Sequence, residues 1–165
     1  MTLEAAAVVM AWVTIALLAL AMSGLLRQIR ALEADLSLRR VTVGPALGSP
    51  APSLDGVGWQ NPTLLLFAEA GCPTCHATLS EFATAAESSD GLAFVAVFRG
   101  EANGFRSPQV RVLEAQDVSF ADYRVPLTPF AIAVSARGTV ADAAAIGSRV
   151  ALHDFVVRTR KREGQ

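Results

Sequence analysis

The sequence predicts an α/β domain, with a central mixed sheet flanked by helices, behind one N-terminal transmembrane helix. Three observations lead to this fold class. The run from residue 5 to 26 is apolar and carries no charge. Two short apolar runs, 63–68 and 92–98, enclose a stretch with helical spacing. The only two cysteines, Cys72 and Cys75, lie between the first of these runs and that helix, as expected for a site at a strand-to-helix junction.

The first apolar run predicts a membrane anchor within residues 1–26. About 20 helical residues at about 1.5 Å each match a bilayer core of about 30 Å. A cleaved signal peptide is the alternative, but the segment opens with Glu4 instead of basic residues, and its apolar run exceeds the usual length of about 7–15 residues. A buried core helix is the other alternative. We therefore expect a retained anchor.

The distribution of charge bears on topology and on partners. Four arginines follow the anchor and nothing basic precedes it except the amino terminus: Arg27, Arg30, Arg39 and Arg40. The positive-inside rule would place the remainder of the chain in the cytoplasm. The net charge is only −1 and no basic stripe alternates with aromatic residues, which argues against a nucleic-acid partner.

Residues 27–61 are expected to form a stalk and a linker. Apolar side chains in the stalk region are spaced by four, three and four residues: Leu25, Ile29, Leu32 and Leu36. This stripe lasts fewer than two heptads, so a helical stalk at the membrane surface is favoured over a dimerising coiled coil. A stretch rich in Gly and Pro follows and marks the linker before a folded domain at 62–165.

The domain is expected to begin with a strand, a helix and a strand. TLLLFA (63–68) and LAFVAVF (92–98) are continuous apolar runs, which suit strands covered on both faces. Apolar residues at helical spacing lie between them: Leu79, Phe82, Ala83 and Ala86. The helix should end at SSDG (88–91). This pattern predicts a βαβ unit with a parallel strand pair.

The second half predicts a further helix, a hairpin and a closing helix. SPQVRVLEAQ (107–116) opens with Ser-Pro, a helix start signal. FAIAV (130–134) and TVADAAA (139–145) predict two strands about a turn in which Gly138 can take a positive φ. SRVALHDFVVRTRK (148–161) predicts an amphipathic helix. The resulting order, βαβ, helix, ββα, resembles a thioredoxin-like fold.

The cysteine motif supports two chemistries. Cys72 and Cys75 spell the C-x-x-C of a dithiol redox site, and with His76 they spell the haem-attachment pattern C-x-x-C-H. At a helix N-terminus, free N–H groups and the helix dipole favour the thiolate of the first cysteine, and the second lies one turn on, where it can resolve a mixed disulfide. Pro73 suits the first helical turn because its missing N–H needs no partner. Pro73 and Thr74 also tune the redox potential.

Two segments resemble the thioredoxin superfamily: PTLLLFAEAGCPTC is similar to its strand-to-active-site segment and LTPFAIAV to its Thr-Pro loop. Within the superfamily, the chain resembles the membrane-anchored MauD and TlpA-like proteins, MauD being an accessory protein of methylamine dehydrogenase maturation. Five segments carry this resemblance in the same order: the anchor with LLRQIRALE, then VGPALGSPAP, CPTC, YRVPLTPF and GSRVALHDFV. The resemblance implies that Cys72 is the attacking thiol and Cys75 the resolving thiol. It also implies that Pro129, after Thr128, is a cis-proline facing them, with Pro126 as the competing candidate.

The resemblance also implies a function and a location. It implies a membrane-anchored thiol-disulfide oxidoreductase that reduces or isomerises disulfides of extracytoplasmic proteins, in the maturation of a redox enzyme or a cytochrome. A membrane electron donor of the CcdA/DsbD type would be its partner, and no cofactor is required. The catalytic domain is then expected on the extracytoplasmic face, despite the arginines, because disulfides persist there and long domains cross membranes largely regardless of charge.

Two positions depart from thioredoxin proper. The buried Asp six residues before the first cysteine is replaced by Leu66, and the Trp directly before that cysteine by Gly71. The usual acid for deprotonating the resolving thiol is therefore absent. Glu69 could serve through water, although a solvated loop carboxylate is the simpler interpretation. His76 could stabilise a thiolate or lie on the helix surface without a role.

Three other functions compete with dithiol exchange. Covalent haem needs His76 and a second axial ligand, but all three methionines lie in or before the anchor and only His153 remains. A zinc site would need a spacing that two Cys and two distant His do not provide. A non-catalytic assembly factor would use the fold only to grip a partner, and it would have no need of two thiols at this spacing.

Overall fold

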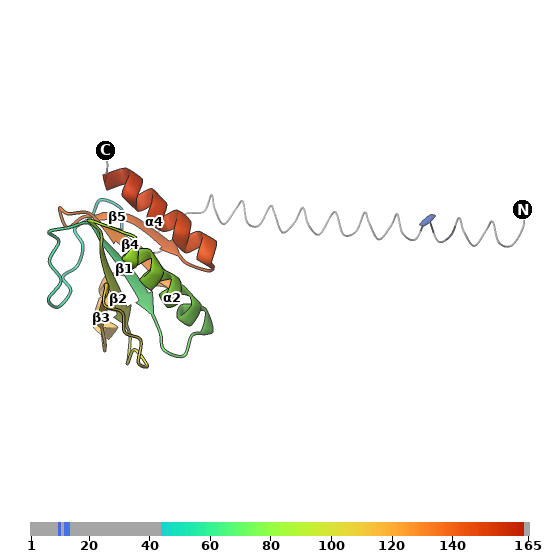
Figure 1. The fold of residues 1–165 in the computed structure, drawn as a ribbon, viewed down its shortest axis with the longest axis horizontal. Helices are drawn as coiled ribbons and strands as arrows, with labels where there is room; N and C mark the ends of the chain where they lie inside the picture. The colour runs from blue at the N-terminus through green and yellow to red at the C-terminus, as the bar shows by residue number, and fades with distance from the viewer. Residues whose placement is uncertain (1–9, 11, 14–43, 164–165) are drawn as a thin grey trace, which may run out of the picture. The chain divides into compact units, whose positions relative to one another are not determined.

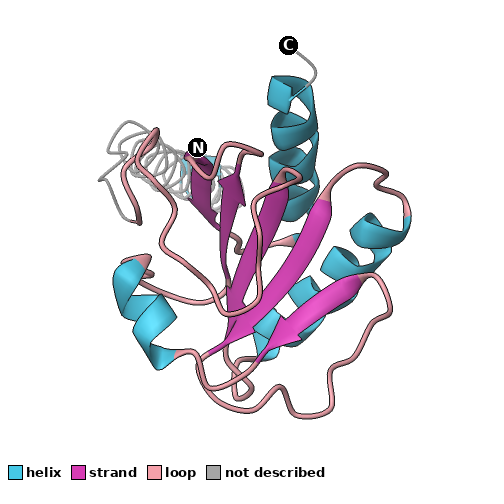
Figure 2. Cartoon of the chain, turned by 90° about the vertical axis from the view of Figure 1, so that its left-hand side faces the viewer, coloured by secondary structure: helices cyan, strands magenta, loops and turns pink. Residues whose placement is uncertain are grey.

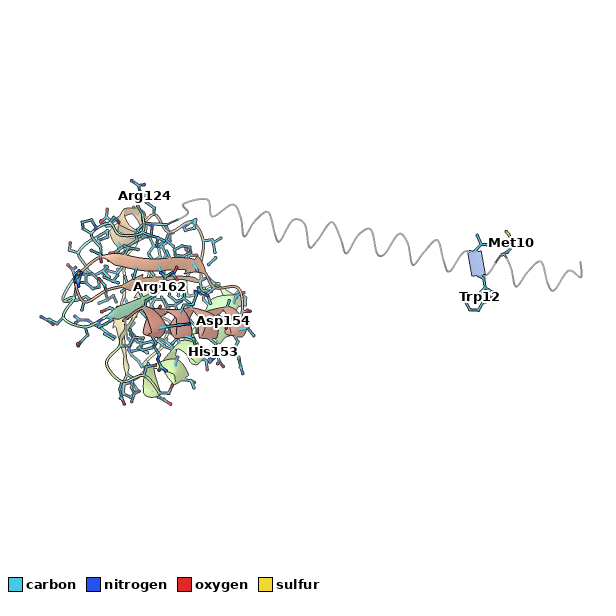
Figure 3. The ribbon with its side chains drawn as sticks, turned by 90° about the horizontal axis from the view of Figure 1, so that it is seen from above. Met10, Trp12, Arg124, His153, Asp154 and Arg162 are labelled. Atoms are coloured by element: carbon cyan, nitrogen blue, oxygen red, sulfur yellow. The ribbon has the colours of Figure 1, made fainter. Side chains whose placement is uncertain are left out.

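A computed structural model describes residues 10, 12–13 and 44–163 of the chain, which divides into two units, Met1–Val41 and Thr42–Gln165. The predicted anchor and stalk lie outside the described residues, apart from Met10, Trp12 and Val13, which are helical (Figure 3). Among the residues described, no helix combines the length and the apolar character needed to cross a membrane.

The second unit is built on a five-stranded mixed sheet in the order β3-β2-β1-β4-β5 (Figure 1). Its strands are β1 (Thr63–Ala68), β2 (Ala93–Phe98), β3 (Val110–Leu113), β4 (Phe130–Val134) and β5 (Val140–Ala145). β2 pairs in parallel with β1 and β3, whereas β4 is antiparallel to β1 and β5. β1 is therefore central, and all six of its residues are buried, which explains why its sequence does not alternate with polar residues.

Helices cover both faces of the sheet. They are α2 (Pro73–Glu87), α3 (Asp117–Asp122) and α4 (Arg149–Glu163). One apolar cluster joins Leu64 and Leu66 of β1 to residues of α2 and α4, and a second joins Phe67 of β1 to Phe120 of α3. The rings of Phe67 and Phe120 meet edge to face with centroids 5.0 Å apart. Figure 2 shows α3 on the side of the sheet away from α2 and α4.

Six of the predicted elements are found where the sequence placed them: β1, α2, β2, β4, β5 and α4. The turn between β4 and β5 has Gly138 at φ 71°, also as predicted. The prediction of a helix over 107–116 is wrong, because this segment contains β3, which pairs in parallel with β2. Its V-R-V-L sequence suits an edge strand, with β-branched residues alternating around an exposed arginine. A short helix, α3, follows the strand instead.

The segment before β1 also packs on the sheet. Pro50 forms an antiparallel bridge with Thr139, and Leu54 is buried in the cluster that contains α3. The hydroxyl of Tyr123 donates to the carbonyl of Pro52 at 2.6 Å. Tyr123 is itself completely buried, so this bond satisfies a polar group that would otherwise be costly to enclose. These contacts hold the segment against the face of the sheet that α3 covers.

Candidate active site

The two cysteines lie at the carboxyl end of the central strand. β1 ends at Ala68 and α2 begins at Pro73. Cys72 is the N-cap of α2, and Pro73 occupies the start of the helix, where a missing N–H costs nothing. The sulfur of Cys72 therefore lies at the N-terminus of a helix of 15 residues, as the sequence predicted.

The two sulfurs differ in access. The Sγ of Cys72 accepts a hydrogen bond from the backbone N–H of Cys75 at 3.2 Å, and its thiol donates to the carbonyl of Thr128 at 3.9 Å. Cys72 is partly exposed, whereas Cys75 is completely buried, and both are free thiols. An incoming disulfide can therefore reach Cys72 but not Cys75.

Burial also sets the acidity of the inner thiol. Desolvation, followed by the hydrogen bond with Cys72, raises the pKa of Cys75 to about 11. The backbone of Glu69 and the side chain of Thr128 act in the opposite direction. The net effect keeps Cys75 protonated at neutral pH.

The loop before β4 faces the cysteines. Its Thr128–Pro129 peptide is cis, which agrees with the choice of Pro129 over Pro126. Antiparallel pairing sets Phe130 opposite Phe67, near the end of β1, and this register brings the loop beside the start of α2. The Pro129 carbonyl accepts from the N–H of Ile146 at 2.9 Å, so the loop is held from the β5 side as well.

Glu69 does not occupy the place of a buried acid. Its carboxylate accepts from Nε of Arg99 at 2.9 Å, and both side chains are close to half exposed. Leu66, at the position of the thioredoxin Asp, is completely buried. Arg99 was missed from the sequence, where the one signal is that Glu69 and Arg99 each follow a predicted strand by one residue. Their meeting also depends on the register in the structure, which pairs Ala68 with Phe98.

The other auxiliary candidates lie on the first turn of α2. Pro73, Thr74 and His76 are all exposed. Nε2 of His76 lies 3.0 Å from the carbonyl oxygen of Ala70, in the loop that precedes Cys72. His76 is therefore bonded to the loop that precedes Cys72 and is not free on the helix surface.

The geometry of the two cysteines does not suit haem attachment. Attachment of haem needs both cysteine sulfurs at the edge of the macrocycle, but Cys75 has no exposed surface. His153 lies exposed on α4 next to Asp154 (Figure 3). Within the part of the chain that the structure describes, no three His, Cys, Asp or Glu side chains gather as a metal site.

Comparison with known proteins gives structural matches only. No protein-family model and no curated protein sequence matches the chain. A thioredoxin-like protein in the oxidized form matches with a TM-score of 0.57 and 18% identity, over 72% of this chain and 99% of its own. MTB dsbF matches with a TM-score of 0.52 and 24% identity, over 68% and 96% of the two chains. A thioredoxin-family thiol:disulfide interchange protein from Chlorobium tepidum TLS matches with a TM-score of 0.52 and 18% identity, over 69% and 97%. These likenesses show that the domain has the predicted thioredoxin-like fold.

Proposed function

We propose that this chain, with its thioredoxin-like fold, is a thiol-disulfide oxidoreductase in which Cys72 attacks and Cys75 resolves. The observation that carries the proposal is the unequal access of the two sulfurs, one partly exposed at a helix N-terminus and the other enclosed behind it. A dithiol exchange needs one sulfur that meets the substrate and a second that meets only the first. The C-x-x-C spacing supplies both within one helical turn.

The reaction follows in two steps. The Cys72 thiolate attacks one sulfur of a substrate disulfide, so that a mixed disulfide forms and the other substrate sulfur leaves as a thiolate. Cys75 then loses its proton and attacks the Cys72 sulfur, which closes the Cys72–Cys75 disulfide and releases the second substrate thiolate. Two electrons pass from the protein dithiol to the substrate, and a second dithiol must reduce the protein again. In isomerisation a substrate thiolate, instead of Cys75, attacks the substrate sulfur of the mixed disulfide. This step forms a new substrate disulfide and releases the Cys72 thiolate, so no net electrons are transferred.

The loop before β4 supports a polypeptide substrate. The carbonyl of Thr128 lies beside the Cys72 sulfur, and an extended substrate chain could pair with this backbone while its sulfur reaches Cys72. Leu127, the residue before Thr128 in this loop, is about half exposed, at 51%. The loop that lies beside the Cys72 sulfur through Thr128 thus also presents an apolar side chain that a substrate chain could contact.

The finer proposal concerns the setting of the reaction. We propose that residues 1–26 anchor the chain in the membrane and that the domain acts on the extracytoplasmic face, on disulfides of proteins that mature there. The apolar N-terminal run and the resemblance to MauD and TlpA-like proteins support this setting. The reductant would be a membrane dithiol donor of the CcdA/DsbD type, because reduction or isomerisation requires the Cys72–Cys75 pair to be kept as thiols.

Trapping of mixed disulfides tests the activity. The full chain carrying Cys75→Ser should accumulate covalent complexes with substrate proteins, and reduction should dissolve them, because the attacking thiol has lost its resolver. Cys72→Ser is the matched control and should trap none. Equal trapping by the two variants would overturn the assignment of roles.

The double variant separates an enzyme from a non-catalytic assembly factor. Replacing both Cys72 and Cys75 with Ser removes exchange chemistry but leaves the fold available for binding. Loss of maturation of the partner protein in cells is expected. A double variant that supports maturation as well as the unaltered chain would show that the protein acts as a scaffold.

A further inference from the structure

Cys72 closes a four-residue turn, residues 69–72, at the start of α2. The N–H of Cys72 donates to the carbonyl of Glu69 at 3.2 Å, so Ala70 and Gly71 occupy the two central positions. A Cβ added at Gly71 would meet nothing within 4 Å. Side-chain packing therefore does not hold the turn at Gly71, and the Ala70 side chain beside it is half-buried.

Such a turn can be a type I or a type II β-turn, which differ by rotation of the central peptide. Type II requires a positive φ at the third residue, which glycine adopts at little cost. Gly71 is the third residue here, and it does not have a positive φ. The structure thus shows only one of the two forms that the sequence permits.

Two side chains hold the turn from outside. Arg99 binds the carboxylate of Glu69, which fixes the first residue. His76 binds the carbonyl oxygen of Ala70, which belongs to the central peptide itself. Because a carbonyl only accepts, Nε2 of His76 must carry the donated proton. Rotation of the Ala70–Gly71 peptide would point this carbonyl away and break the bond.

We propose that His76 is a positioning residue for disulfide exchange. Its Nε2–H holds the Ala70–Gly71 peptide in the form seen here and so directs the Cys72 sulfur toward the incoming disulfide. The histidine of the C-x-x-C-H pattern would then act by its hydrogen bond to the loop that precedes Cys72. This role requires neither a charge on the imidazole nor contact with a sulfur atom. This inference rests on the proposed function for its biological meaning.

The test measures attack by Cys72 on a small uncharged disulfide, 2,2′-dithiodipyridine, with the reduced full chain in detergent. Release of pyridine-2-thione is followed at pH 8, where an ordinary histidine is neutral. His76→Leu removes the donor and should slow the first release about fivefold, the ratio that about 1 kcal/mol for one hydrogen bond represents. His76→Gln keeps an amide N–H and should react within about twofold of the unaltered chain, on the same scale.

The other histidine of the chain provides the matched control. His153 lies exposed on α4, and His153→Leu should leave the rate unchanged. His76→Ala is a second donor-free variant in case the leucine variant does not fold. The inference is overturned if the donor-free variants react as fast as the unaltered chain, or if His76→Gln is as slow as they are. The rate of attack on this probe does not depend on a protein substrate. A failure of mixed-disulfide trapping would therefore overturn the proposed function but would leave the result for His76 unaffected.

Discussion

Cys75 shows how burial of a single residue can order the steps of a reaction. Its thiol is completely enclosed, and desolvation is the largest cause of its raised pKa. The carboxylate of Glu69 is engaged by Arg99, and Leu66 fills the position of the thioredoxin acid. The described residues therefore place no buried carboxylate beside Cys75 that could take its proton. Loss of that proton should limit the resolving step.

The pH dependence of resolution follows from the raised pKa. Below about 11, the thiolate fraction of Cys75 rises about tenfold per pH unit, and the resolving rate should rise with it. Release of pyridine-2-thione should then occur in two phases, the slower of which accelerates between about pH 7 and 10. Cys75→Ser should abolish the slow phase. If the rate of the slow phase does not change over this range, deprotonation of Cys75 does not limit the resolving step, and the prediction is wrong.

At the scale of elements, one carboxylate connects the edge of the sheet to the closing helix. Asp142 of β5 is buried, with 6% of its surface exposed. Its Oδ2 lies 3.4 Å from Nε of Arg158 and 3.9 Å from Nη1 of Arg162, both on α4. The same helix is tied to α2 by the ion pair of Arg149 with Glu81 at 2.8 Å. α4 thus forms ion pairs with the rest of the domain near both of its ends.

Asp142→Asn should destabilise the fold through this contact. The variant removes the charge but keeps the size of the side chain, and the two arginines are close to half exposed, so water can solvate them. We therefore expect the free energy of unfolding to fall by about 1–2 kcal/mol, which is less than the loss on breaking a fully buried ion pair. Urea unfolding of the full chain measures it, with exposed Asp154→Asn on α4 (Figure 3) as the control. Equal unfolding midpoints for the two variants would exclude the proposed coupling.

At the scale of the whole molecule, the side of the membrane is the central question. The arginines after residue 26 favour a cytoplasmic domain, whereas the proposed chemistry needs a compartment where disulfides persist. The chain has only two cysteines, and only Cys72 has exposed surface. Labelling of the folded protein by a thiol reagent therefore reports on Cys72 alone.

A thiol reagent that cannot cross membranes should label Cys72 in intact cells after mild reduction. The expected result is labelling before lysis that does not increase afterwards. The variant with both cysteines changed to Ser gives the background. Protection of Cys72 until the cells are lysed would place the domain in the cytoplasm and contradict the proposed role in extracytoplasmic maturation.

The sequence by itself determined the regular elements of the sheet and its main helices. Continuous apolar runs predicted β1 and β2, helical spacing predicted α2 and α4, and the position of C-x-x-C between them predicted Cys72 at a helix N-terminus. These signals are local, because periodicity and capping depend on residues within a few positions of one another. The Thr-Pro loop was also predicted, from its resemblance to a known loop and not from periodicity.

Only the tertiary structure decided how distant residues meet. The segment at 107–116 opens with a helix start signal, yet β3 forms there because pairing with β2 outweighs a weak local preference. The ion pair of Glu69 with Arg99 depends on the register of β1 with β2, which the sequence does not reveal. The complete burial of Cys75 beside a partly exposed Cys72 depends on how the sheet and α4 pack around α2. The C-x-x-C pattern could therefore locate the reactive pair, but the different access of its two sulfurs arises from packing between elements far apart in the chain.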